Sequence, residues 1–288
     1  MRLPLRHGRR ARQAIGGAAV AATLAALGAT AVSTAATTAH AAGAPAVRAA
    51  APSAWTASFD GFPANSWKSA WGVVNTAQFG FDRMDPLTGG GVKVKYGKGS
   101  SAPSCTNCPT GGGAQFYTNL GAIGKGSWAT GRTLSLKYEI KFPAGHDFGK
   151  GAKLPGLYGG NPNEAAGGTH GNGWSTRFMF RNGNKGQIYF YSPAGSGYGK
   201  DLGLGSWTFP ADDQYHTIEQ YVDRNRQTTT VWFDGRQVLS TSTAGISGIN
   251  FGGIFFSTFY GGHSTEWGPK KTSYAWFKNF SLSQSVQH

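Results

Sequence analysis

The sequence predicts an all-β protein: a single domain folded as an antiparallel β-sandwich of the jelly-roll type. Three observations support this prediction. No stretch repeats apolar residues at the 3.6-residue spacing of an amphipathic helix. The 288 residues include 45 glycines and many aromatic side chains. Short runs of β-branched and aromatic residues alternate with turn residues, as they do in two stacked antiparallel sheets.

The first element is interpreted as a leader rather than as part of the fold. Residues 1–41 open with five arginines and no acid, continue with an Ala-rich apolar stretch, and end at Ala39-His40-Ala41, a small-x-small cleavage pattern. This order predicts a secretion signal peptide and a secreted, extracellular protein. A transmembrane anchor is the alternative, but the stretch is only marginally apolar for that role. Arg9-Arg10 leaves a twin-arginine signal open.

The chain after the leader divides into three predicted parts. Residues 42–54 are rich in Ala and Pro and are predicted to be a disordered linker. Residues 55–283 form the β domain, and residues 284–288 are a tail. Without the leader, 22 basic residues face 13 acidic ones, and this excess favours an anionic partner. Charge alone does not distinguish an acidic polysaccharide from nucleic acid or an anionic membrane.

Ten segments of the domain are predicted to be strands, because each is a run of β-branched, aromatic or alternating residues bounded by turn residues. The dipeptide Asp234-Gly235 between two of them predicts a tight hairpin turn. The ten segments are Gly91–Tyr96, Ala114–Leu120, Arg132–Phe142, Ser175–Arg181, Gln187–Ser192, Tyr215–Asp223, Thr228–Asp234, Gln237–Thr241, Phe251–Tyr260 and Ser273–Leu282.

Two glycine-rich stretches between these strands are predicted to be loops. The first, Gly97–Gly113, contains Cys105 and Cys108. In an exported protein this pair predicts a local disulfide, whereas a redox pair would need a βαβ setting and a zinc site two further ligands. The second stretch, Gly145–Gly173, is long for a compact domain. Loops of that length are often functional, and a solvated insertion is the alternative.

Side-chain alternation predicts a polar and aromatic patch on one hairpin. Successive side chains of a strand point to opposite faces of the sheet, and the core must hold the Phe and Ile faces of both strands together. We therefore expect Phe178 to lie opposite Phe190, and Arg177 opposite Tyr191. The face away from the core then carries Ser175, Arg177, Tyr189 and Tyr191.

Such a patch suits a sugar that carries a carboxylate. Tyrosine rings pack against pyranose faces while their hydroxyls form hydrogen bonds. An arginine grips a carboxylate with two parallel hydrogen bonds. An ordinary solvent-facing surface is the alternative, since tyrosine is common on strands.

The acidic residues argue against hydrolysis of a glycosidic bond. Glycoside hydrolases generally use two positioned carboxylates. The four glutamates, Glu139, Glu164, Glu219 and Glu266, contain no pair at strand-face spacing within one segment. Elimination at a uronate instead needs a group that neutralises the carboxylate, a base and an acid. Arg, Lys or a neutral donor can neutralise the carboxylate, and Tyr, Lys or His can act as base and acid when cationic neighbours lower their pKa values.

The histidines give no metal-ligand spacing, so no cofactor is predicted, and dependence on a divalent cation is left open. His216 lies in a predicted strand and is expected to be packed rather than catalytic. His170 lies in the second glycine-rich stretch and is retained as a candidate substrate-binding residue.

Several short motifs together resemble polysaccharide lyase family 14, which contains alginate lyases and lyases acting on glucuronate polymers. The resemblance spans roughly residues 55–282. The motifs are Lys153–Gly160 (KLPGLYGG), Trp174–Arg177 (WSTR), Tyr189–Tyr191 (YFY), Phe259–Gly262 (FYGG) with Trp267, and Ala275–Phe280 (AWFKNF).

The resemblance implies a jelly roll with a substrate cleft on its concave sheet. It also implies functional roles for one Lys, one Ser, one Arg and two Tyr. Carried over to matching positions, Lys153, Arg177, Tyr189 and Tyr191 are expected to be catalytic and Ser175 to bind substrate. We expect Arg177 to neutralise the uronate carboxylate, and Lys153 and a tyrosine, preferably Tyr191, to share proton abstraction and donation.

Together these features predict a secreted polysaccharide lyase that cleaves a uronate-containing polysaccharide, such as alginate or glucuronan, by β-elimination. Two alternatives stay open: a non-catalytic carbohydrate-binding module, and a glycoside hydrolase that brings distant carboxylates such as Glu139 and Glu219 together. The expected partner is the acidic polysaccharide, with no nucleic acid and no membrane. The protein is expected to be a monomer.

Overall fold

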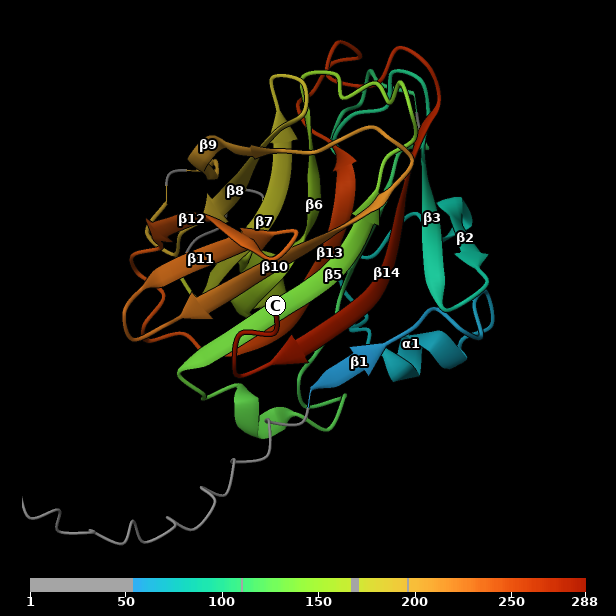
Figure 1. Cartoon of the computed structure of the whole chain (residues 1–288). Helices are drawn as coiled ribbons and strands as arrows, with labels where there is room; N and C mark the ends of the chain where they lie inside the picture. The colour runs from blue at the N-terminus through green and yellow to red at the C-terminus, as the bar shows by residue number, and fades with distance from the viewer. Residues whose placement is uncertain (1–53, 110, 167–170, 196) are drawn as a thin grey trace, which may run out of the picture. The chain divides into compact units, whose positions relative to one another are not determined.

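A computed structural model describes residues 54–109, 111–166, 171–195 and 197–288 (Figure 1). The predicted signal peptide, almost all of the predicted linker and the candidate His170 lie outside these residues. The described part of the chain consists of fourteen strands in two antiparallel sheets, with a few short helices. None of the helices in these ranges is both long and apolar enough to cross a lipid bilayer.

The eight-stranded sheet faces the viewer in Figure 1. Strand β1 begins at Trp55 and pairs with β14, and all neighbouring strands are antiparallel. The strand order is β12 (Arg236–Ser242), β11 (Thr228–Phe233), β10 (Tyr215–Asp223), β5 (Thr133–Lys141), β14 (Ser273–Ser283), β3 (Gly91–Tyr96) and β2 (Met84–Leu87), with β1 (Trp55–Ala57) beside β14.

The six-stranded sheet packs behind it and carries the candidate site. Its order is β4 (Ala114–Tyr117), β13 (Phe251–Tyr260), β6 (Gly151–Gly160), β7 (Gly173–Arg181), β8 (Lys185–Tyr191) and β9 (Lys200–Thr208). The helices are α1 (Ser66–Ala70) and three 3₁₀ turns, η1 (Phe81–Arg83), η2 (Gly126–Trp128) and η3 (Pro162–Glu164).

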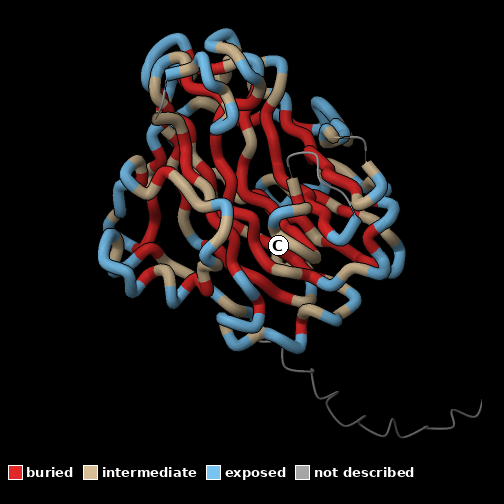
Figure 2. The backbone as a smooth tube through the Cα atoms, turned by 180° about the vertical axis from the view of Figure 1, so that it is seen from behind, coloured by how far each residue is buried: buried red, intermediate tan, exposed pale blue. Residues whose placement is uncertain are grey.

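The core fills the space between the sheets. Alternate residues of β5, such as Leu136 and Tyr138, are fully buried, and the Tyr138 ring lies 6.1 Å from that of Phe178 on β7. The ring of Tyr138 stacks on that of Phe280 at 4.8 Å between centroids. In Figure 2 the buried backbone runs along the strands, and the exposed segments gather at the loops around them. The two inner faces thus form one aromatic-rich core.

The fold class is confirmed: the described chain is a β-sandwich, and all ten predicted segments coincide with strands. The two-residue turn at Asp234-Gly235 also forms, with both residues at positive φ. His216 is packed as expected, because its ring stacks on Phe233 at 5.4 Å and pairs with Asp212 and Asp234.

One predicted loop is in fact a strand. Lys153 was expected in a loop before Pro155, but both residues lie inside β6. The pairing of β6 with β7 shifts between Leu154 and Gly156, so the proline occupies a bulge. A Cβ on Gly156 would lie 2.4 Å from the Cα of Arg177. This glycine therefore serves close packing of two strands rather than a loop.

The register of the β7–β8 hairpin also differs from the prediction. Phe178 pairs with Ile188 rather than with Phe190, and Arg177 pairs with Tyr189 rather than with Tyr191. The turn between Arg181 and Lys185 contains three residues, two fewer than expected, because Asn182 and Gly183 adopt positive φ. A shift of two residues keeps every side chain on its predicted face.

Candidate active site

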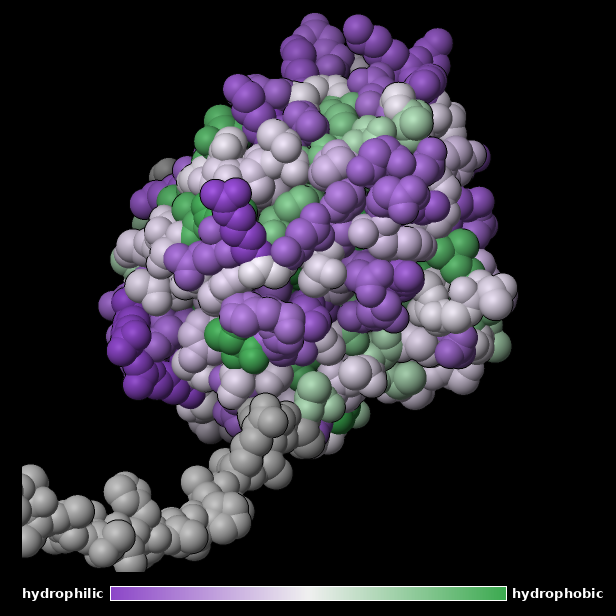
Figure 3. All heavy atoms as spheres, in the orientation of Figure 1, coloured by the Kyte–Doolittle hydropathy of each residue, from purple (hydrophilic) through white to green (hydrophobic). Residues whose placement is uncertain are grey.

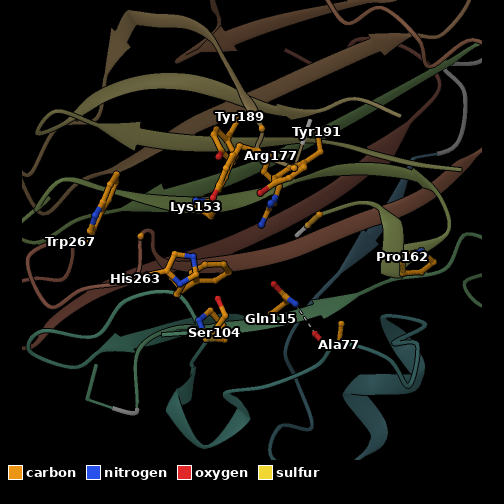
Figure 4. A pocket seen from close by; sticks show the side chains of 18 of the residues that line it. Ala77, Ser104, Gln115, Lys153, Pro162, Arg177, Tyr189, Tyr191, His263 and Trp267 are labelled. Atoms are coloured by element: carbon orange, nitrogen blue, oxygen red, sulfur yellow. Dashed lines mark hydrogen bonds between the residues drawn. The ribbon is translucent and has the colours of Figure 1, made fainter. Parts of the chain in front are cut away.

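A groove of about 1170 Å³ lies on the outward face of the six-stranded sheet (Figure 4). All six strands contribute to its lining, and segments between strands form its rims. The lining side chains from β6, β7 and β8 include Lys153, Arg177, Tyr189 and Tyr191. Alternation explains their presence, since their strand neighbours Leu154, Phe178, Ile188 and Phe190 point into the core. The structure thus brings the four predicted catalytic residues together.

Lys153 lies in the centre of this groove and is half-buried. Its ammonium nitrogen lies 4.5 Å from the centroid of the Tyr189 ring and 5.8 Å from that of Phe259. Burial, together with the charges of Arg177 and Arg181, lowers the pKa of Lys153 to about 7. Asp201 opposes this shift but forms its ion pair with Arg181. Lys153 is therefore available as a neutral amine near pH 7.

Arg177 is a buried cation at the floor of the groove. Only 2% of the residue is exposed, and Nη1 donates a hydrogen bond of 2.9 Å to Oγ of Ser257. The guanidinium carbon lies 4.4 Å from the Phe255 ring centroid and 5.3 Å from that of Tyr191. Burial lowers the pKa of Arg177, although a guanidinium remains charged at neutral pH. Its charge is thus available to an anionic group in the groove.

Ser257 connects Arg177 to strand β4. Its hydroxyl donates a hydrogen bond of 3.2 Å to Oε1 of Gln115. The Gln115 amide nitrogen in turn donates a hydrogen bond of 2.7 Å to the carbonyl of Ala77. Both side chains are therefore fixed by hydrogen bonds on either side. This chain of contacts holds the Arg177 guanidinium in one orientation.

The two tyrosines lie side by side next to these cations. Their ring centroids are 5.4 Å apart with edge-to-face geometry. Burial, together with the neighbouring Tyr191, raises the pKa of Tyr189 to about 12. The Tyr191 hydroxyl is within hydrogen-bonding reach of both Tyr189 and Arg177. Tyr189 is therefore protonated at neutral pH.

Ser175 occupies the predicted face of β7 but does not line the groove. It is fully buried, and its hydroxyl donates a hydrogen bond of 2.6 Å to the carbonyl of Ala165. Contrary to expectation, Ser175 therefore does not contact sugar directly but fixes the segment after η3. His170 falls outside the described residues, so its place relative to the groove is not described.

Several lining residues were not identified from the sequence. Arg181 shares the outward face of β7 with Arg177, so alternation could have identified it. Its Nε lies 3.1 Å from Oδ2 of Asp201 on β9, a strand that was not predicted. Gln115, His263 and Trp267 come from distant parts of the chain, and only the sheet topology brings them here. In Figure 4 His263 and Gln115 lie across the groove from Lys153 and the tyrosines.

The predicted disulfide forms and supports one wall of the groove. Cys105 and Cys108 are bonded, and the preceding residues Pro103 and Ser104 line the groove. The oxygen of the neighbouring Ser101 hydroxyl lies 2.5 Å from the carbonyl oxygen of Gly261 and 2.7 Å from that of Gly262, and its single proton is shared between them. The disulfide loop is thus fixed to the end of β13.

Carboxylates are scarce in this groove. Of the lining residues that the structure describes, only Asp201 carries one. Glu139 and Glu219 lie on β5 and β10 of the other sheet, so the two-carboxylate hydrolase that would use them is not supported. In the described ranges, no three His, Cys, Asp or Glu side chains gather as a metal-binding group would require.

Comparison with known structures gives the same fold. The PL-14 alginate lyase from Aplysia kurodai superposes with a TM-score of 0.68 at 23% sequence identity, covering 82% of this chain and 100% of that one. The alginate lyase Aly36B superposes with a TM-score of 0.56 at 20% sequence identity, covering 83% of this chain and 100% of that one. An alginate lyase from Chlorella virus gives 0.55 at 20% identity, covering 75% and 93%.

No curated protein sequence matches the chain. The sequence model of the family described as polysaccharide lyase 14 matches residues 87–280, which is well over half of the chain. This match confirms the resemblance drawn from the short motifs. The chain therefore belongs to the polysaccharide lyase 14 family and is a polysaccharide lyase.

Proposed function

We propose that this lyase depolymerises a uronate-containing polysaccharide, such as alginate or glucuronan, by β-elimination in the groove of the six-stranded sheet. The observation that carries the proposal is the environment of Lys153, whose pKa is lowered to about 7 beside a buried arginine and two tyrosines. The three similar structures compared above are alginate lyases, and this supports alginate as the first polymer to test.

Arg177 neutralises the uronate carboxylate. Negative charge builds at C5 when its proton leaves, and it spreads into the carboxylate, so a fixed cation there lowers the barrier. Arg177 is already oriented by Ser257 and has no carboxylate partner in the described part of the chain. It therefore keeps its charge available for substrate without reorganisation.

Lys153 takes the C5 proton and Tyr191 returns one to the leaving oxygen. The C5–H electron pair becomes the C4–C5 double bond, and the C4–O bond breaks with its pair on oxygen. Tyr191 suits donation because it lies within reach of Tyr189 and of the Arg177 guanidinium, whose charge favours the tyrosinate left after the proton is given up. The ammonium of Lys153 then reprotonates the tyrosinate through water. The scheme uses no cofactor.

Tyr189 and Ser175 support this chemistry without exchanging protons. The Tyr189 ring lies against the Lys153 amine and offers a face to a pyranose. Ser175 acts indirectly, through its hydrogen bond to Ala165 at the groove edge.

The experiment is ultraviolet absorbance with purified protein and a panel of polymannuronate, polyguluronate and polyglucuronate. The unsaturated product absorbs because its double bond is conjugated to the carboxylate. A rise in absorbance with one polymer would support the proposal and identify the substrate. A flat trace with retained binding would instead support a carbohydrate-binding module.

We also propose that the protein is exported and acts as a monomer. The basic and apolar leader and the Cys105–Cys108 disulfide support export, because disulfides persist in oxidising compartments. Expression of the full chain in a secreting host should place protein in the medium with an N-terminus near residue 42. Retention of the leader in the cell membrane would contradict this. Size-exclusion chromatography with light scattering tests the monomer.

A further inference from the structure

A row of alternating lysines and aromatic residues crosses the outward face of the eight-stranded sheet, the sheet without the groove. Strand register places Lys93 opposite Trp276, Trp276 opposite Lys141, and Lys141 opposite Tyr215. These residues belong to the neighbouring strands β3, β14, β5 and β10. We call this set the lysine–aromatic row. It spans about 14 Å, because neighbouring strands are about 4.8 Å apart.

The row points outward and is not covered by the part of the chain that the structure describes. Its strand neighbours Val92, Phe277 and Ile140 point into the core. All four row residues are partly exposed. The C-terminal segment packs elsewhere on this sheet, where the Gln287 side chain contacts Ser135 and Ser281. Figure 3 looks onto this face and shows hydrophilic side chains in purple among paler ones.

The charges of the row are only partly neutralised. Lys93 pairs with Asp85 at 2.9 Å, and the adjacent Lys278 pairs with Glu139 at 3.1 Å. Lys141 lies between two rings, 4.8 Å from the Trp276 centroid and 5.3 Å from that of Tyr215. Within the described ranges no carboxylate forms an ion pair with Lys141. A cation held between two aromatic rings is thus left for an external anion.

A third ring extends the row along β14. The Tyr274 ring lies 6.1 Å from Trp276 between centroids, and register places Lys95 opposite Tyr274. Lys95 is exposed and likewise has no ion-pair partner in the described part of the chain. The surface therefore repeats a unit of one aromatic ring beside one lysine at two neighbouring positions.

We propose that the lysine–aromatic row is a second binding surface for an acidic polysaccharide, separate from the groove. Aromatic rings stack on pyranose faces, and ammonium groups pair with the carboxylates that such a polymer repeats along its length. The identity of this polymer rests on the proposed function. The row holds a long chain on one face of the enzyme while the groove on the other sheet cuts, which raises the effective concentration of substrate.

The test compares the wild type with the double variant Trp276→Ala/Tyr215→Ala on a polyuronate and on its tetrasaccharide. We expect KM for the polymer to rise about tenfold, since the second contact is lost. Turnover of the tetrasaccharide, which fills only the groove, should not change. Tyr221→Ala is the matched control, because Tyr221 lies on the same outward face of β10, away from the row.

Lys141→Glu gives an independent variant in case the double variant folds poorly. It should raise KM for the polymer at least as much as the double variant, whereas Lys141→Arg should not. Wild-type kinetics on the polymer in both row variants would overturn the proposal while leaving the lyase activity established. Absence of cleavage of any polyuronate by the wild type would instead overturn the proposed function.

Gel retardation identifies the class of polyanion. Lys153→Met protein should be retarded in native gels containing polyuronate, and the added row substitutions should reduce the retardation. Double-stranded DNA is the competing probe. If DNA retards the protein as strongly as polyuronate does, and the row substitutions abolish this retardation too, the assignment to polysaccharide is overturned.

Discussion

Lys153 is a half-buried amine that has no ion-pair partner in the described part of the chain. Its pKa falls to about 7 because burial disfavours the ammonium form and two arginines repel it. An exposed lysine would be almost fully protonated at neutral pH and could not accept a proton. The same side chain in this groove is divided between its two forms. Its unusual environment is therefore the property that fits it for proton abstraction.

This environment predicts the pH dependence of the reaction. The neutral amine is the active form, so kcat/KM should rise with pH and level off above about 7. Initial rates between pH 5 and 9 with a fully ionised polyuronate give the profile. A rate that falls across this range would mean that Lys153 acts as its ammonium.

Lys153→Met should lower the turnover and raise the free energy of unfolding. The pKa in the folded state lies below the value of 10.5 in the unfolded chain, so between these values the unfolded chain binds more protons. The wild-type free energy of unfolding should therefore rise with pH from about 7 to 10.5, and the methionine variant should lack this rise.

At pH 7 the methionine variant should be more stable by on the order of 1–3 kcal/mol, because it buries no charge. Its turnover should fall by about 10²–10⁴-fold, the usual contribution of a general base. Urea denaturation at several pH values and the absorbance assay measure the two effects. A variant less stable than the wild type would contradict the burial of an unpaired amine.

Strand β6 shows how an element can be hidden from sequence reasoning. Its segment contains one proline and four glycines, which are ordinarily typical of loops. The proline is accommodated at a bulge, and Gly156 lets the backbone approach Arg177 closely. Neither requirement is visible without the neighbouring strand. Lys153 was therefore identified by resemblance, while its place in the sheet was not.

Gly156→Ala should damage both the sandwich and the site. The added Cβ would lie 2.3 Å from the carbonyl oxygen of Thr176, so β6 and β7 must separate. We expect a loss of about 1–3 kcal/mol in the free energy of unfolding. Displacing Lys153 from Arg177 by even 1 Å should lower kcat by about 10²-fold.

Gly248→Ala is the control for this substitution. No atom lies within 4 Å of a Cβ built at Gly248. Its melting temperature and turnover should match those of the wild type. Equal behaviour of the two variants would show that β6 and β7 do not need the close approach.

The β7–β8 hairpin shows which predictions were secure. Alternation placed Arg177, Tyr189 and Tyr191 on one face, and this holds for any register of the same parity. The exact partners depend on the number of turn residues, and Asn182 and Gly183 at positive φ shortened the turn by two. The face could thus be predicted from the sequence, whereas the cross-strand pairs could not.

The whole sandwich assembles the site from parts that sequence reasoning could not join. Gln115 on β4 and Asp201 on β9 belong to opposite edges of the six-stranded sheet, yet both line the groove. Their positions follow from the strand order β4-β13-β6-β7-β8-β9, which no local pattern encodes. Composition and turn spacing were enough to predict two stacked sheets. The long-range order of the strands was accessible only through the resemblance to a family.

The imbalance of charge in the groove has a consequence for how fast substrate arrives. Among the described lining residues, Lys153, Arg177 and Arg181 face one carboxylate, that of Asp201, and a positive cleft attracts a polyanion before contact. Salt should weaken this steering, because the Debye length falls from about 30 Å at 0.01 M to about 10 Å at 0.1 M. We therefore expect kcat/KM to fall as sodium chloride is added while kcat stays constant. The enzyme would then capture its polymer most rapidly in dilute media.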